Sequence, residues 1–276
     1  MLNIVSLGLI SILVGFLGSL TGLGGASILI PILVFFGVPV KEAIASAMVA
    51  IIATSSGSAS SYVREHITNI RVAMYLEVFT ITGAIAGATI TTIIQPAYLY
   101  FFFAAFLLTT FMRFGNSISK DFAPSEDQDR VSKWLGLRGS YFDESARKVI
   151  AYRATNAVLG GAGMLVAGLA AGMLGIGAGA FKVTVQENIL KMPPKVSSAT
   201  SNFIIGMTAL AGVSVYLFSG LLNLTLMAPM AVGTTIGAVV GGRVLNKISN
   251  RSLRILFFVI VAYLIIQMLY KGVMAI

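Results

Sequence analysis

The stretch Gly22-Leu23-Gly24-Gly25-Ala26-Ser27 returns 153 residues later (175 − 22) as Gly175-Ile176-Gly177-Ala178-Gly179-Ala180. Downstream of it, the two halves of the chain correspond at a separation of 154 residues. A duplicated unit with a glycine break inside an apolar stretch is typical of secondary transporters. The matched pairs are Pro39 with Pro193, Ala45 with Ala199, Tyr62 with Tyr216, Asn69 with Asn223, Gly83 with Gly237 and Gly87 with Gly241.

The composition indicates a membrane protein. Hydrophobic residues make up 57% of the 276 residues and charged residues 11%, whereas roughly a quarter of a soluble domain is charged. Eight apolar runs approach the ~20 residues that a helix needs to cross a bilayer. We therefore expect an all-α polytopic membrane protein. The runs are residues 4–20, 43–60, 72–94, 98–112, 154–173, 197–218, 225–242 and 253–270, and two shorter runs, 26–36 and 180–190, follow the glycine stretches.

Two residue types that often carry chemistry are nearly absent. The chain has no cysteine and one histidine, His66, which excludes disulfides, thiol chemistry and metal sites built from several histidines. No metal or cofactor is therefore predicted.

The formal net charge of +9 could indicate nucleic-acid binding in a soluble protein, but no basic face with interleaved aromatic residues is present. We attribute the charge to basic loops that orient a membrane protein.

The basic residues fall mainly into four loops. If all four loops are cytoplasmic and both short runs count as passes, the chain begins outside, crosses the membrane ten times and ends outside. Sixteen of the nineteen Lys and Arg residues then lie inside, Lys41 and Lys271 lie outside, and Lys182 lies within the membrane. This positive-inside bias predicts a multi-pass protein of the cell (inner) membrane.

The same topology makes the two halves inverted repeats. Each half holds about five segments, and the first half starts outside whereas the second starts inside. We expect a first repeat at residues 1–112, a cytoplasmic linker at 113–148 and a second repeat at 149–276. The linker carries Trp134 and Tyr141, which could anchor it at the membrane interface. A regulatory element is the alternative to a plain connection.

The two short runs cannot span the membrane as straight helices, because eleven residues at ~1.5 Å rise reach only about half the hydrocarbon thickness. Each is predicted to be a broken or re-entrant half-helix, whose free N–H groups suit an anion. Two such starts would form one central substrate site. The alternative is that the glycines only permit close helix packing. The candidate residues here are Gly22, Gly24, Gly25, Ser27, Gly175, Gly177 and Gly179.

The short run of the second half also carries charged and amide side chains. Lys182 would lie near the membrane midplane, where a charge is costly and marks a functional candidate, and Gln186 shares its helix face. We hypothesise that Lys182 attracts an anionic substrate; the alternative is a structural ion pair with Glu187 or Glu77. Those two carboxylates are also candidate proton carriers, or else static partners of Lys182 or Arg71.

Small polar residues mark the third segment of each half. Ser46 in the first half aligns with Thr200 in the second, where Ser201 and Asn202 follow. Their hydroxyl and amide groups could bind the oxygens of an oxyanion or could serve as ordinary interhelical contacts. Both interpretations stay open.

Taken together, these features resemble the sulfite exporter TauE/SafE family of membrane transporters. The resemblance covers the chain apart from residues 113–148, and it departs from the family at Thr184, where proline is common. It implies transport of small anions such as sulfite, sulfoacetate or related organic acids, with direction and substrate varying within the family. The residues that carry it are the first glycine stretch leading to Pro31, the second leading to Phe181-Lys182-Val183, the turns at Pro39 and Pro193, and the loops at Asn69 and Asn223.

We expect a secondary transporter for a small anion, coupled to protons and working by alternating access; a passive anion channel is the alternative. An intramembrane enzyme is disfavoured, because His66 is predicted in a loop and no aspartate lies in a span. No G-x-x-x-x-G-K-[ST] motif supports ATP drive. The expected partners are the substrate, the bilayer and protons, with no nucleic acid, and a homo-oligomer is an open option.

Overall fold

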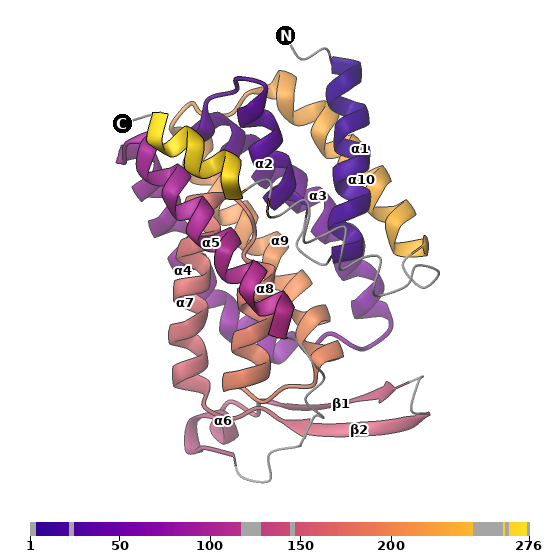
Figure 1. Cartoon of the computed structure of the whole chain (residues 1–276). Helices are drawn as coiled ribbons and strands as arrows, with labels where there is room; N and C mark the ends of the chain where they lie inside the picture. Colours follow the sequence, from indigo (N-terminus) through magenta and orange to yellow (C-terminus); the bar gives the residue numbers. More distant parts are fainter. Residues whose placement is uncertain are drawn as a thin grey trace.

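The fold is a bundle of helices with a small hairpin at one end (Figure 1). The structure is a computed structural model that describes residues 4–21, 25–116, 128–143, 147–244, 262 and 265–274. The predicted all-α membrane fold is confirmed. In chain order the elements are α1 (Ile4–Thr21), α2 (Ala26–Phe35), α3 (Val40–Arg64), α4 (Ile70–Ile93), α5 (Pro96–Asn116), α6 (Arg130–Trp134), β1 (Arg138–Asp143), β2 (Lys148–Arg153), α7 (Ala157–Leu174), α8 (Gly179–Thr184), the π-helix η1 (Val185–Ile189), α9 (Pro194–Phe218) and α10 (Leu224–Val244), with a last helical stretch at 265–274.

Helix length and hydropathy fit a membrane environment. Among the described residues, α3, α4, α7 and α9 are each long and apolar enough to span a bilayer, and α1, α2, α5 and α10 contain shorter apolar stretches.

Individual residues determine where some of the helices begin. The Asn69 side chain accepts a hydrogen bond from Val72 N at 3.1 Å and so caps the start of α4. Pro194 occupies the first position of α9, where its missing N–H costs nothing.

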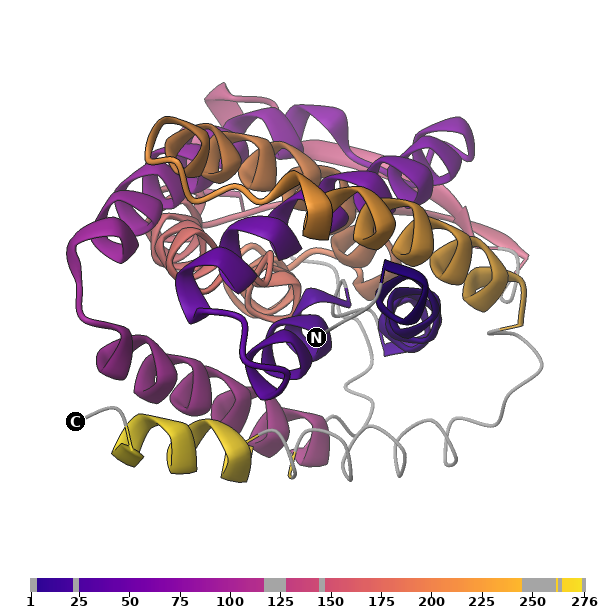
Figure 2. The same cartoon turned by 90° about the horizontal axis from the view of Figure 1, so that it is seen from above.

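Two pairs of helices come into close backbone contact at glycines. Helix α1 packs against α10, and α4 packs against α7 (Figures 1 and 2). A Cβ atom added at Gly15 would clash with the backbone of Thr234, and one added at Gly168 would clash with the backbone of Thr80. The two contacts correspond across the halves, because 168 − 15 is 153 and 234 − 80 is 154. Glycine permits this close approach of helix backbones.

The centre of the bundle is formed by α3 and α9, which pack against each other. The short helix α2 packs on α3, and the short helix α8 packs on α9. The main hydrophobic core includes Met48 of α3, Phe103 of α5 and Tyr216 of α9, all fully buried. The first six residues of α2 and Lys182 of α8 are buried inside the bundle, and burial in protein is the condition for a broken helix at membrane depth.

The described part of the predicted linker contains helix α6 and strand β1, which forms a hairpin with β2; the sequence analysis did not predict this regular structure. The strands are antiparallel, with Gly139 opposite Tyr152 and Tyr141 opposite Ile150. Tyr141 and Tyr152 are buried and join a hydrophobic cluster that includes residues of α4 and α9. Tyr141 is therefore a core residue rather than an interfacial anchor, and the hairpin continues past residue 148 to Arg153.

Both described ends of the chain lie at the end of the bundle opposite the hairpin (Figure 1). At that end, two lysines bind helix carboxyl ends: Lys41 Nζ donates to Thr92 O at 2.9 Å, and Lys271 Nζ donates to Val34 O at 2.6 Å. Unpaired carbonyls and the helix dipole favour a cation at such positions. These are the two lysines expected on the outer side, and the assignment of this end to the outside stays a prediction.

Candidate functional site

A lysine lies inside the bundle. Lys182 belongs to the short helix α8 and is fully buried. Its Nζ donates a hydrogen bond to Thr208 Oγ1 on α9 at 2.9 Å, and the Thr208 hydroxyl in turn donates to Ile204 O at 2.6 Å. Because the hydroxyl proton is directed at Ile204, the oxygen lone pairs are available to the ammonium. Thr208, which the sequence analysis missed, therefore fixes the position of Lys182 Nζ.

A carboxyl group on α4 completes the electrostatics around this lysine. Glu77 is 4% exposed, and its Oε1 has no hydrogen-bond partner. When both groups are ionised, Glu77 and Lys182 attract each other, while the hydrogen bond of Lys182 goes to Thr208. Glu187, the other candidate carboxylate, is half buried in η1. The structure thus places Glu77 and Lys182 close enough for their charges to interact.

Gln186 is a buried amide without partners. It lies in the π-helical turn η1, four residues after Lys182, and is fully buried. Neither its Nε2 nor its Oε1 has a hydrogen-bond partner. The turn closes with Leu190 N donating to Val185 O at 3.1 Å, and such turns occur frequently at functional sites. A ligand that bonded to this amide would remove the cost of leaving it unsatisfied.

The second glycine stretch breaks the helical path inside the bundle. Gly175, Gly177 and Ala178 have φ angles of 63°, 70° and 48°, in the left-handed region that glycine adopts easily. A Cβ added at Gly175 would lie 2.8 Å from Ile44 Cγ2 on α3. One added at Gly177 would lie 3.0 Å from Ile205 Cγ2 on α9. The stretch is therefore held tightly between α3 and α9, and it leads directly into Gly179 at the start of α8.

Two side chains that the sequence analysis missed satisfy the end of α7. Tyr216 OH donates to Gly172 O at 2.6 Å, and Thr91 Oγ1 donates to Met173 O at 3.0 Å. The last carbonyl groups of a helix have no intrahelical partner, and at membrane depth water cannot replace one. The signal that could have found both residues is a polar side chain within an otherwise apolar helix.

The first glycine stretch is described only in part, since Gly22 and Gly24 lie outside the described residues. Gly25 precedes α2 with a φ of 67°, and its carbonyl oxygen accepts a hydrogen bond from Ile28 N at 3.0 Å. Ser27 is buried, and its Oγ has no hydrogen-bond partner. The described part of this glycine stretch thus contributes backbone groups and the unpaired hydroxyl of Ser27.

The small polar residues of the third segments divide into two groups. Ser46 is fully buried on α3, and its Oγ has no hydrogen-bond partner. On α9, Thr200 Oγ1 accepts from Asn69 N at 3.1 Å, and Ser201 Oγ donates to the carbonyl oxygen of the first residue of α8 at 3.4 Å. Asn202 Nδ2 donates to a carbonyl one turn earlier in α9 at 3.0 Å. The three α9 groups therefore serve contacts within the chain, whereas the Ser46 hydroxyl is unpaired.

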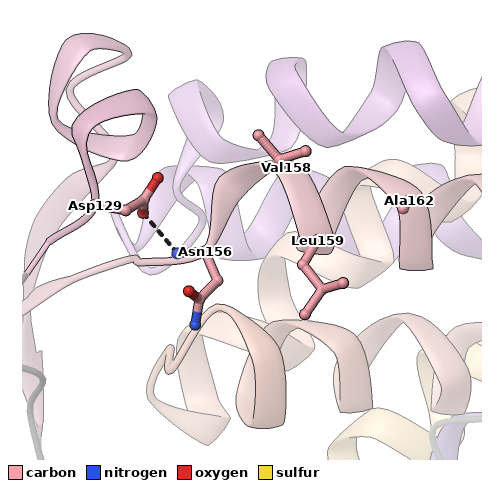
Figure 3. Close-up of a pocket in the computed structure, with 5 residues that line it drawn as sticks. All are labelled: Asp129, Asn156, Val158, Leu159 and Ala162. Atoms are coloured by element: carbon pink, nitrogen blue, oxygen red, sulfur yellow. Dashed lines mark hydrogen bonds between the residues drawn. The ribbon is translucent and has the colours of Figure 1, made fainter.

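A surface pocket of about 310 Å³ lies on the outer side of α7 (Figure 3). Of its lining residues, Val158 and Leu159 are more than half exposed, as expected for a lipid-facing surface. No candidate residue from the sequence analysis lines this pocket. Its lining consists of Asp129, Asn156, Val158, Leu159 and Ala162.

Asp129, at the polar end of that pocket, links α6 to the segment between β2 and α7. Its Oδ1 accepts from Asn156 N at 2.6 Å, and its Oδ2 accepts from Ser132 N at 3.2 Å. Burial raises the pKa of Asp129, but hydrogen bonds from Ser132, Asn156 and Thr155 outweigh it, so that the pKa lies below its usual value. Thr155 N then donates to Leu190 O, just after η1, at 3.1 Å. The pocket thus borders a network of hydrogen bonds that joins α6, the segment before α7 and the residue after η1.

Comparison with known proteins points to one family. A sequence model of the family described as sulfite exporter TauE/SafE matches residues 7–268. The chain is 23% identical over 282 residues to "Probable membrane transporter protein YunE" of Bacillus subtilis (strain 168), covering 99% of both proteins. It is 26% identical over 249 residues to "Probable membrane transporter protein YdhB" of the same organism, covering 89% of this chain and 90% of that protein. No solved structure matches.

Proposed function

The chain belongs to the sulfite exporter TauE/SafE family of membrane transporters, and from this premise we propose that it moves a small oxyanion through one central site at Lys182. The proposed substrates are sulfite, a sulfonate or a related organic acid, in keeping with the family description. The proposed mechanism is secondary transport by alternating access, coupled to protons.

The observation that carries this proposal is the full burial of the Lys182 side chain, whose Nζ donates to Thr208. Burial of a charge costs several kcal/mol unless the charge is compensated. The Thr208 hydroxyl accepts a hydrogen bond from one of the three N–H groups of the protonated Lys182 side chain. An apolar residue at this position would serve stability at least as well. A small anion that enters beside Lys182 would offset part of the burial cost, which gives the site its affinity and its preference for negative charge.

Glu77 supplies a route to proton coupling. Its carboxylate competes with an incoming anion for the same positive charge, because it attracts Lys182. Protonation of Glu77 would remove this competition, so proton uptake and anion binding would favour each other. In this proposal each monoanion is bound together with one proton, which keeps the net charge of the site constant.

The helix crossings support an alternating-access mechanism. The contact of Gly15 with Thr234 and that of Gly168 with Thr80 recur at equivalent positions of the two halves. In Figure 1, α1 and α7 run in opposite directions through the bundle. We therefore propose that the halves are inverted repeats, one group of helices rocking against the other around a fixed site. The hairpin end would then be cytoplasmic and both termini outside.

Transport into proteoliposomes tests this proposal. Vesicles that contain unlabelled sulfite should take up labelled sulfite faster than empty vesicles, because exchange requires a carrier and an open channel shows no such stimulation. Lys182→Ala should abolish uptake and Lys182→Arg should retain part of it. Lys41→Ala, which removes only a helix-end contact, is the control and should transport normally. Normal transport by Lys182→Ala, or uptake without stimulation by internal substrate, would overturn the proposal.

A further inference from the structure

We propose that Gln186 recognises a hydrogen-bond donor on the substrate, so that the site prefers oxyanions that carry a hydroxyl or an acidic proton beside their charged group. This inference rests on the proposed function, because it places the substrate next to Lys182. It concerns the choice between anions, not whether anions are carried.

The unpaired atoms of the Gln186 side chain are the starting point. The side chain is fully buried, and both Nε2 and Oε1 lack hydrogen-bond partners. A primary amide has two N–H donors and an oxygen that only accepts. Buried side-chain polar atoms in folded proteins nearly always have a partner. A ligand that satisfied both ends of this amide would therefore bind more tightly than one that satisfied a single end.

A bare oxyanion cannot satisfy both ends of the amide. Its oxygens can accept hydrogen bonds from Gln186 Nε2 and from the remaining N–H groups of Lys182. They have no proton to offer Gln186 Oε1, and a negatively charged oxygen placed against Oε1 would be repelled. A hydroxyl group on the ligand, or the acidic O–H of a singly protonated oxyanion, supplies the donor that Oε1 lacks.

The described neighbours do not supply this donor themselves. The hydroxyl proton of Thr208, the group bonded to Lys182, is already directed at Ile204 O. Glu77 Oε1 has no hydrogen-bond partner and both polar atoms of Gln186 also lack one, so the Glu77 carboxyl group is not bonded to this amide. The ammonium group of Lys182 has donors left, but these are the ones proposed to hold the anionic oxygens. The donor for Gln186 Oε1 therefore has to come with the ligand.

Two matched pairs of monoanions test the inference: acetate with glycolate, and ethanesulfonate with 2-hydroxyethanesulfonate. The members of each pair carry the same charge at pH 7 and differ by one hydroxyl group. Ligand-dependent thermal shifts of the purified full chain give an apparent Kd for each anion. We expect the hydroxylated member to bind roughly two- to tenfold more tightly, the effect of one neutral hydrogen bond.

Variants assign the preference to the amide. Gln186→Met keeps the side-chain length and removes both polar atoms, so the preference should fall to about onefold. Gln186→Leu serves if that variant does not fold. Gln267→Met is the matched control, because it removes a different, partly buried amide, which donates to Pro31 O on α2. This variant should keep the wild-type preference.

The outcomes separate this inference from the proposed function. Equal affinity of the wild type for both members of each pair overturns the inference while leaving the proposed function intact, provided that the anions bind. A preference that survives in Gln186→Met also overturns it. If none of these anions nor sulfite stabilises the wild type, the proposed function fails together with the inference.

Discussion

Thr208→Val removes the hydroxyl that holds Lys182 and preserves the size of the side chain. In the structure, Lys182 Nζ donates to this hydroxyl at 2.9 Å, and both residues are fully buried. A hydrogen bond to a charged group contributes about 1.5–3 kcal/mol, and its loss leaves the buried charge with one partner fewer. We therefore expect Thr208→Val to lower the free energy of unfolding by about 2 kcal/mol.

Thr80→Val is the matched control for this change. Thr80 is also a fully buried helical threonine, but its hydroxyl donates only to Leu76 O and Glu77 O of its own helix, at 3.3 and 3.1 Å. Both acceptors are neutral carbonyl groups. The loss of this hydroxyl should cost less than about 1 kcal/mol.

Equilibrium unfolding of the purified variants in detergent measures these differences, with Lys182→Met and the Lys182→Met/Thr208→Val double variant completing a thermodynamic cycle. Because the cost comes from the ammonium group, Thr208→Val should be close to neutral once Lys182 is absent. Thr208→Ser, which keeps the hydroxyl, should recover most of the stability. Equal costs of Thr208→Val with and without Lys182 would refute the assignment of Thr208 as the group that fixes the charge.

Gly175→Ala should destabilise the chain by more than about 1 kcal/mol in thermal unfolding, because φ is 63° and the new Cβ would press on α3, whereas Gly57→Ala, with open space around it, should not. Asp129→Asn should lower thermal stability at pH 7. That loss should shrink below about pH 4, because a carboxylate with a lowered pKa stabilises above its unfolded pKa and ceases to as pH falls through its folded pKa; a loss independent of pH would contradict this account. Since the chain has no cysteine, Ser140→Cys in the hairpin and Ser219→Cys after α9 report topology. An impermeant maleimide applied to intact cells should label only Ser219→Cys, and labelling of Ser140→Cys instead would reverse the proposed orientation.

The long helices could be predicted because their signal is the length of an apolar run. The ends of α3, α4, α7 and α9 lie within a few residues of the predicted limits, since backbone exposed to lipid has to form helix. Lys182 and Gln186 were also visible in the sequence, because a charge or an amide within an apolar run stands out. Their burial is what that pattern implies.

Contacts between elements could not be predicted. Nothing in the spacing shows that Thr208 meets Lys182, or that Tyr216 and Thr91 meet the end of α7, because these bonds depend on how the helices cross. The hairpin was missed because its strands have six residues each, too short for a distinct alternating pattern. Aromatic residues such as Tyr141 are equally compatible with a membrane interface.

The two lysines bound to helix ends would make the two approaches to the proposed central site unequal. At the end that holds the termini, Lys41 and Lys271 each offset the partial negative charge of a helix carboxyl end. Long-range attraction would therefore gather anions at the opposite end, over about one Debye length of ~8 Å at physiological ionic strength. Added salt should therefore slow anion binding from the hairpin end and scarcely affect binding from the end that holds the termini. Anions would then reach the site faster from the hairpin end, even without any helix movement. The exposed cations at the hairpin end are Arg64, Arg71, Arg130, Lys133, Arg138, Arg147, Lys148, Arg153, Lys191 and Lys195.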